Sequence, residues 1–169
     1  MKQYIQYYPD TPVGDLALTA DEVGLTGLWL GRKDFAAEEF EEKDLRVFRQ
    51  AREWLDAYFA GREPETEVPL HMTGSDFRKR VWEKIREIPY GRTVTYGEIA
   101  KSLEAENGGK RVSAQAVGGA VGRNPVPVIV PCHRVMGAGG NLTGYGGGIG
   151  RKIALLKLEG AWQEGFYIP

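Results

Sequence analysis

Short strand-like apolar runs, separated by polar turns, fill the first thirty residues of the chain. The runs cover residues 3–8, 16–19 and 25–30, and runs of this length bounded by turn residues are typical of β-strands. Between them lie residues 12–15 (Pro-Val-Gly-Asp) and 20–24 (Ala-Asp-Glu-Val-Gly), which supply the Gly and Asp that tight turns need. The pattern predicts an antiparallel β meander.

Over residues 47–60 the spacing of apolar residues becomes helical, and Gly61 follows as a C-terminal cap. The apolar face comprises Val47, Ala51, Trp54, Leu55, Tyr58 and Phe59. Residues 62–73 then hold two prolines and four charged residues, which is typical of a linker. We therefore predict an N-terminal α/β domain over residues 1–70, a linker near residues 62–73 and a C-terminal domain over residues 74–169.

The C-terminal domain begins with a second amphipathic helix over residues 75–88. Ser75 is suited to cap this helix and Pro89 to close it. Its inward face comprises Phe77, Val81, Trp82, Ile85 and Ile88. Thr95 and Glu98 then match a capping box, so a short helix is expected to run to about Leu103.

A further short helix fits residues 113–122, with Ala114, Val117 and Val121 facing inward. Two short helices joined by a glycine-containing turn are typical of a helix-turn-helix, whose second helix lies against DNA. Two ordinary core helices are the alternative. Gly118 and Gly119 weaken the helix, and they make sense if a partner approaches its surface closely.

Charge is distributed unevenly between the two halves, although the net charge is only −1. Residues 1–70 hold 8 Lys and Arg against 15 Asp and Glu, whereas residues 71–169 hold 14 against 8. Either the halves dock on each other, or the basic half contacts a polyanion such as a nucleic acid.

No apolar run approaches the roughly 20 residues of a membrane span, and residues 1–5 lack a signal-peptide core, so we expect a cytoplasmic protein without a membrane partner.

Cys132 is the single cysteine among 169 residues, and it follows the apolar run of residues 126–130. We expect a strand over that run, ended by Pro131, with Cys132 directly after its end. The sulfur is either a buried packing group or a reactive thiol. A base at His133, acting through a bridging water, and a positive charge at Arg134 would favour the thiolate, which is the nucleophilic form.

Residues 137–150 hold eight glycines. No Gly-Lys-Ser/Thr ending follows, so the pattern does not indicate a phosphate-binding loop. Beside a candidate nucleophile, we interpret this loop as one wall of a substrate pocket, with its backbone amides as donors. The lone cysteine, His71 and His133 make a poor tetrahedral set, so no metal site is expected.

The chain closely resembles the O6-alkylguanine-DNA alkyltransferases, also called methylated-DNA–protein-cysteine methyltransferases. The resemblance covers nearly all of the chain, and it rests on the segment Pro131-Cys132-His133-Arg134-Val135 together with Asn124-Pro125, Tyr96 and Gly144-Tyr145. It implies an α+β fold, in which a ribonuclease-H-like antiparallel β-sheet with a helix precedes a mostly helical, winged-helix-like domain with a helix-turn-helix. It also implies single-turnover, irreversible transfer of the alkyl group from O6-alkylguanine, and from O4-alkylthymine, in double-stranded DNA to the protein's own cysteine. No cofactor is implied, and the protein would act as a monomer.

The resemblance further implies roles for individual residues. Cys132 would accept the alkyl group, and His133, oriented by Glu159, would act as a base through a water. Asn124 would brace the turn before the cysteine, and Tyr96 would lie near the phosphate 3′ of the lesion and help to rotate or protonate the flipped base. The guanine pocket would be lined by Val135, Tyr145, Gly146 and Gly147, and the DNA contacts would be Gln115, Ala116, Gly119 and Arg123.

Gln115 stands where the family usually has an arginine that enters the base stack, so we expect weaker DNA affinity or slower repair than in an arginine-bearing relative. Two other functions stay open. One is a DNA-binding regulator that carries Cys132 in its core. The other is a cysteine hydrolase, although such enzymes hold their Cys and His apart in sequence.

Overall fold

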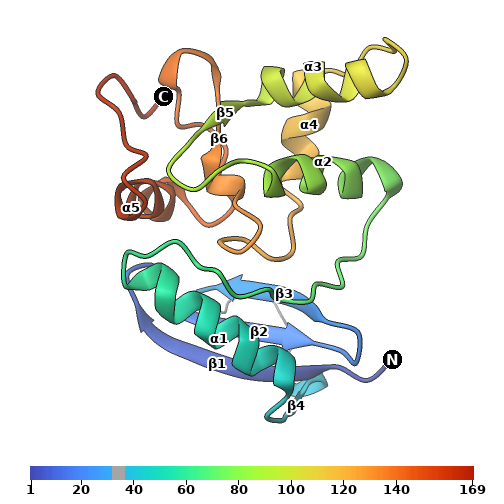
Figure 1. The fold of residues 1–169 in the computed structure, drawn as a ribbon, viewed down its shortest axis with the longest axis vertical. Helices are drawn as coiled ribbons and strands as arrows, with labels where there is room; N and C mark the ends of the chain where they lie inside the picture. The colour runs from blue at the N-terminus through green and yellow to red at the C-terminus, as the bar shows by residue number, and fades with distance from the viewer. Residues whose placement is uncertain (32–36) are drawn as a thin grey trace. The chain divides into compact units, whose positions relative to one another are not determined.

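The computed structural model describes residues 1–31 and 37–169. The chain divides into two compact units, Met1–Thr73 and Gly74–Pro169, which are shown as ribbons in Figure 1. Within the described ranges, no helix is both long and apolar enough to cross a membrane.

The first unit is a four-stranded sheet covered on one face by a helix (Figure 1). Its strands β1 (Tyr4–Thr11), β2 (Gly14–Ala20) and β3 (Leu25–Leu30) form the predicted antiparallel meander. After the short 3-10 helix η1 (Ala37–Glu39), strand β4 (Glu41–Glu42) pairs in parallel with β1, so the sheet is mixed. Two residues carry too little pattern for β4 to be predicted from the sequence.

Helix α1 (Arg46–Phe59) matches the predicted amphipathic helix within one residue at each end. Helix α1 packs against β1 and β2. Its buried residues are Val47, Phe48, Ala51, Leu55 and Tyr58. Gly61 follows with φ +82°, the left-handed conformation that a C-terminal cap requires and that glycine adopts without strain.

Residues 62–73 belong to the first unit. Leu25 donates its N–H to Pro69 O at 2.8 Å, and His71 donates its N–H to Leu25 O at 2.8 Å. The buried Asp21 carboxylate lies 2.6 Å from His71 Nδ1. The end of this segment is therefore held against the first residue of β3.

The second unit contains four α-helices: α2 (Asp76–Arg86), α3 (Tyr96–Glu106), α4 (Ala114–Val121) and α5 (Ile149–Leu158). Ser75 caps α2, Ser113 caps α4, and Thr95 and Glu98 form the predicted capping box of α3. Helices α2, α3 and α4 pack on one another, and the buried indole of Trp82 donates to Ala120 O at 2.9 Å. The predicted stripe of α4 is wrong at Ala114, which is exposed, while Ala120 is buried.

Residues 126–130 form turns, so the strand predicted there is wrong. Val128 has φ +74°, and Val130 donates its N–H to Val126 O at 2.9 Å. Asn124 closes this turn, because its Nδ2 donates to Val130 O at 2.8 Å and its Oδ1 accepts from Val126 N at 3.0 Å. Prolines have no N–H for a ladder, and they recur here at Pro125, Pro127 and Pro131.

Two short pieces of regular structure follow the turn. The 3-10 helix η2 (Cys132–Arg134) leads into strand β6 (Val135–Met136), which pairs in parallel with β5 (Val94–Thr95) just before α3. This pairing brings the residues after the cysteine beside the first residue of α3. A third 3-10 helix, η3 (Ala138–Gly140), begins the glycine-rich loop.

Candidate functional site

Cys132 lies at the first position of η2, directly after the turn braced by Asn124. The residue is 7% exposed, and its N–H donates to Val130 O at 2.8 Å. Burial raises the pKa of the Cys132 thiol to about 11, although hydrogen bonding from the Asn124 side chain and the nearby charge of Lys152 lower it in part. The sulfur is therefore a protonated thiol at neutral pH, and it must lose a proton before it can act as a nucleophile.

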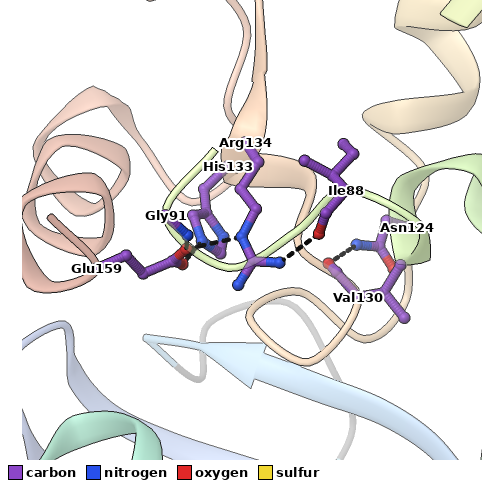
Figure 2. A network of polar contacts seen from close by, with 7 residues as sticks. All are labelled: Ile88, Gly91, Asn124, Val130, His133, Arg134 and Glu159. Atoms are coloured by element: carbon purple, nitrogen blue, oxygen red, sulfur yellow. Dashed lines mark hydrogen bonds and ion pairs between the residues drawn. The ribbon is translucent and has the colours of Figure 1, made fainter. Parts of the chain in front are cut away.

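Arg134 does not serve as the positive charge beside the sulfur that the sequence analysis expected. Its Nε donates to Glu159 Oε1 at 2.7 Å, and its Nη1 donates to Ile88 O at 2.8 Å (Figure 2). Its guanidinium also lies over the ring of Tyr90, 5.6 Å from the centroid. The guanidinium thus joins the end of α5 to the loop after α2.

Glu159 is the centre of this network, as Figure 2 shows. Its Oε1 accepts from Arg134 and from the N–H of Gly91 at 3.1 Å, and its Oε2 accepts from Nε2 of His133. Burial opposes the ionisation of Glu159, but the hydrogen bonds from His133 and Arg134, together with the charge of Arg134, outweigh burial and hold its pKa at about 2. The carboxylate is therefore ionised although its side chain is fully buried.

His133 is fully buried, and burial lowers its pKa below the usual value of 6.5 despite the opposing effect of Glu159. The ring is therefore neutral at pH 7, and the pair is a hydrogen bond to a carboxylate. A neutral imidazole donates through one nitrogen and accepts through the other. Because Nε2 faces the carboxylate and donates to it, Nδ1 is the nitrogen with a lone pair that can take up a proton.

Lys152 is a site residue that the sequence analysis missed. Its side chain is fully buried, and its Nζ donates to Val135 O at 2.6 Å and to Thr143 O at 3.2 Å. Burial lowers the pKa of Lys152 to about 8, while the nearby Cys132 raises it in part. A signal was present in the sequence, because Lys152 and Glu159 share the inward face of α5 with Leu155 and Leu156 at helical spacing.

Two tyrosines lie beside the cysteine, near enough that its charge helps to raise the pKa of each. Burial is the larger cause of both shifts. The Tyr96 hydroxyl lies 3.2 Å from both Thr143 O and Gly144 O, so it joins the start of α3 to the glycine-rich loop. Tyr145 is buried, and its hydroxyl makes no hydrogen bond to any residue that the structure describes.

The glycine-rich loop carries Tyr145 and contacts both Tyr96 and α5. Gly144 has φ +77°, and a Cβ atom there would lie 3.0 Å from the Tyr96 hydroxyl oxygen. Gly146 is exposed with open space where a side chain would project, and Gly147 O accepts from Arg151 Nη1 at 3.0 Å. Val135 is buried, and the Lys152 ammonium joins its carbonyl to the loop by donating to both Val135 O and Thr143 O.

The residues expected to contact DNA all lie on the surface. Gln115, Ala116 and Gly119 are exposed on α4, and Arg123 is exposed just beyond its end. Tyr96 lies between α4 and the glycine-rich loop. A Cβ atom at Gly118 of α4 would lie 3.8 Å from the Tyr96 ring, and the Tyr96 hydroxyl bonds to the loop. The site thus combines a buried thiol, imidazole and carboxylate with a helix that presents small, neutral side chains outward.

Comparisons with known proteins cover both units. The family described as "6-O-methylguanine DNA methyltransferase, ribonuclease-like domain" matches residues 3–72, and "6-O-methylguanine DNA methyltransferase, DNA binding domain" matches residues 76–161. A methylated-DNA–protein-cysteine methyltransferase of Methanosarcina acetivorans is 44% identical over 154 residues, which cover 90% of this chain and 96% of the relative. The Mycobacterium tuberculosis protein of the same name is 46% identical over 151 residues, with 89% and 88% covered.

Solved structures are also similar to this chain. The crystal structure of the M. tuberculosis O6-methylguanine methyltransferase matches with a TM-score of 0.81 and 43% identity, covering 94% of this chain and 93% of that one. The M. tuberculosis protein called OGT, solved in complex with DNA, matches with a TM-score of 0.80 and 44% identity over the same shares.

Proposed function

The chain belongs to the 6-O-methylguanine DNA methyltransferase family, and we propose that it repairs DNA by moving the alkyl group of O6-alkylguanine to the sulfur of Cys132. The observation that carries this proposal is the geometry around the single cysteine. The buried thiol of Cys132 follows the turn that Asn124 braces. The next residue, His133, is a neutral imidazole whose Nε2 donates to the ionised carboxylate of Glu159, which leaves Nδ1 to act as a base.

The thiol must be activated because burial holds its pKa at about 11. We assign His133 Nδ1 as the base that takes the proton from the sulfur through a water, with Glu159 stabilising the imidazolium that forms. The sulfur then attacks the alkyl carbon, a C–S bond forms, and the C–O bond to guanine O6 breaks. In the balance, one proton leaves the thiol and one is taken up by the released guanine.

The other site residues have positioning and pocket roles in this proposal. Asn124 fixes the turn that presents the sulfur, and we assign Tyr96, whose hydroxyl contacts the glycine-rich loop, to help rotate or protonate the base. The alkylated nucleotide must leave the duplex to reach the thiol, at a cost of about a few kcal/mol. Its pocket comprises Val135, Tyr145, Gly146 and Gly147.

DNA would meet the exposed face of α4, where Gln115, Ala116 and Gly119 permit a close approach in the minor groove, with Arg123 beside it. Gln115 lacks the charge of the arginine expected at its position. Gln115→Arg is therefore expected to raise DNA affinity or the repair rate. Unchanged repair rates and unchanged affinity for an O6-methylguanine duplex would count against this assignment.

Further details of the proposal follow from the chemistry of the product. A thioether is not cleaved by acid–base side chains, so each molecule acts once and irreversibly. The acceptor is the protein's own sulfur, so the proposal includes no cofactor, and it takes the protein to act as a monomer. O4-alkylthymine is a second substrate, since it carries the same alkyl–oxygen bond. A reactive acceptor thiol must stay reduced, which favours the cytoplasm.

Mass spectrometry after incubation with a duplex containing O6-methylguanine tests the proposal. We expect a mass increase of one methyl group on the peptide that carries Cys132, and loss of the methyl group from the DNA. Cys132→Ala should bind the duplex but remain unmodified. An intact lesion with an unmodified wild-type protein would refute alkyl transfer and favour a DNA-binding regulator. Repeated turnover of an ester or peptide would favour a hydrolase.

A further inference from the structure

The turn between α3 and α4 is a defined structure held by Glu104. The N–H of Gly109 donates to Glu104 O at 2.8 Å, and the N–H of Val112 donates to the Glu104 carboxylate at 2.8 Å. Gly108 and Gly109 have φ of +67° and +84°, which lets the chain reverse between these two bonds. Figure 1 shows the turn projecting past the end of α3.

This turn presents two exposed cations, Lys110 and Arg111. The nearby carboxylates are engaged elsewhere, because Glu106 pairs with Lys84 and lies 4.0 Å from Arg80, and Glu104 accepts from Val112. Across the described parts of the chain, neither Lys110 nor Arg111 has an ion-pair partner. The two charges are therefore directed to solvent and not neutralised by the protein.

The outward face of α4 offers no charge of its own at Gln115, Ala116 or Gly119. Small neutral residues permit close approach to a duplex, but most affinity for DNA comes from neutralising backbone phosphates. The cations nearest in sequence to this face are Lys110 and Arg111 before Ser113, the cap of α4, and Arg123 after its end. The turn that carries Lys110 and Arg111 therefore leads directly into the helix that is proposed to enter the groove.

We propose that Lys110 and Arg111 form a phosphate-binding clamp, which contacts the DNA backbone next to the groove occupied by α4 and supplies sequence-independent affinity. The proposal rests on the DNA-binding function argued above. Lys110 and Arg111 would supply the positive charge that α4 lacks at Gln115. Phosphate contacts of this kind release counterions, so each one steepens the salt dependence of binding.

The test is equilibrium binding of the full chain to an undamaged duplex, measured by surface plasmon resonance between 50 and 200 mM salt. Each lost phosphate contact lowers the slope of log K against log salt by about 0.9, so Lys110→Gln/Arg111→Gln should lower it by about 1.8. The ratio of wild-type to variant affinity should then shrink by about tenfold over this range. The control is Lys79→Gln/Lys157→Gln, which removes two exposed cations of α2 and α5.

An unchanged slope in Lys110→Gln/Arg111→Gln, or an equal change in the control, overturns the clamp. Reaction with the free base O6-methylguanine, which has no phosphates, should be equal in all three proteins, and a loss there would show that the variant is damaged at the thiol site. Because binding is measured on undamaged DNA, the result does not depend on whether alkyl transfer occurs.

Discussion

Glu159→Gln keeps the shape of the buried side chain but removes its charge, and it should impair both stability and alkyl transfer. The carboxylate has a pKa of about 2 in the folded chain against a reference of 4.5. The side chain is fully buried, so this difference corresponds to about 3 kcal/mol of stability at pH 7. Loss of the charge also leaves the guanidinium of Arg134, which is 7% exposed, without its anion.

The pH dependence of this stability has a definite sign. Because the folded-state pKa is the lower one, the contribution of Glu159 is complete above the unfolded pKa of 4.5 and is lost as pH falls toward 2. The difference in unfolding free energy between wild type and Glu159→Gln should therefore shrink by about 1 kcal/mol between pH 7 and pH 3.5. Urea unfolding at both pH values measures it.

Alkyl transfer should slow for a separate reason. If the glutamine oxygen keeps Arg134 and Gly91, its NH2 group faces Nε2 of His133 and requires that nitrogen to accept. The ring proton then moves to Nδ1, the nitrogen that is proposed to receive the proton of the thiol. Loss of general base catalysis predicts a rate about 10²- to 10⁴-fold lower.

The matched control is Glu164→Gln, because Glu164 is an exposed carboxylate of the same unit. It should leave the unfolding free energy and the transfer rate at their wild-type values. The reasoning is refuted if Glu159→Gln unfolds within about 0.5 kcal/mol of wild type at pH 7, or if it transfers methyl groups at the wild-type rate.

Three other outcomes are expected. Ultraviolet titration of the single thiol, referenced to Cys132→Ser, should give a midpoint near 11, and a midpoint below 8 would contradict the buried, protonated sulfur. Gly144→Ala should lose about 1–2 kcal/mol of unfolding free energy, because φ of Gly144 is +77° and the new Cβ would lie 3.0 Å from the Tyr96 hydroxyl oxygen. The control Gly150→Ala should not be destabilised, because a Cβ atom at Gly150 would meet open space. Methylation of Cys132 adds a carbon beside a sulfur that is 7% exposed, so thermal unfolding of the reacted protein should show a loss of about 1–3 kcal/mol, and an unchanged melting temperature would exclude overpacking.

Most of the fold follows from local patterns in the sequence. The three antiparallel strands and the helices α1, α2 and α4 follow from the periodicity of their apolar residues, and the Thr95–Glu98 capping box fixes the start of α3. The apolar pattern predicts an end of α3 one turn early, because residues 104–106 continue the helix without an apolar signal. Strand β4 gave no such pattern.

The site was less predictable where burial contradicts residue type. Residues 126–130 read as a strand because they are rich in Val and Ile, but the flanking prolines and the side chain of Asn124 impose a turn. Lys152 follows Arg151 and looks like a solvated helix start, although it lies on the buried stripe of α5. The short sequence distance between Arg134 and Cys132 predicts that the guanidinium acts on the sulfur, whereas it pairs with a carboxylate 25 residues further along the chain.

The bond from the Trp82 indole to Ala120 O also makes the second unit suited to optical study. This indole is 1% exposed, and it is the donor that ties α2 to the helix proposed to enter the groove. With Trp29, Trp54 and Trp162 replaced by phenylalanine, its emission becomes a single intrinsic signal from the back of α4. A shift of that emission on adding a duplex would record strain at the helix from the protein side, in real time and without an attached dye.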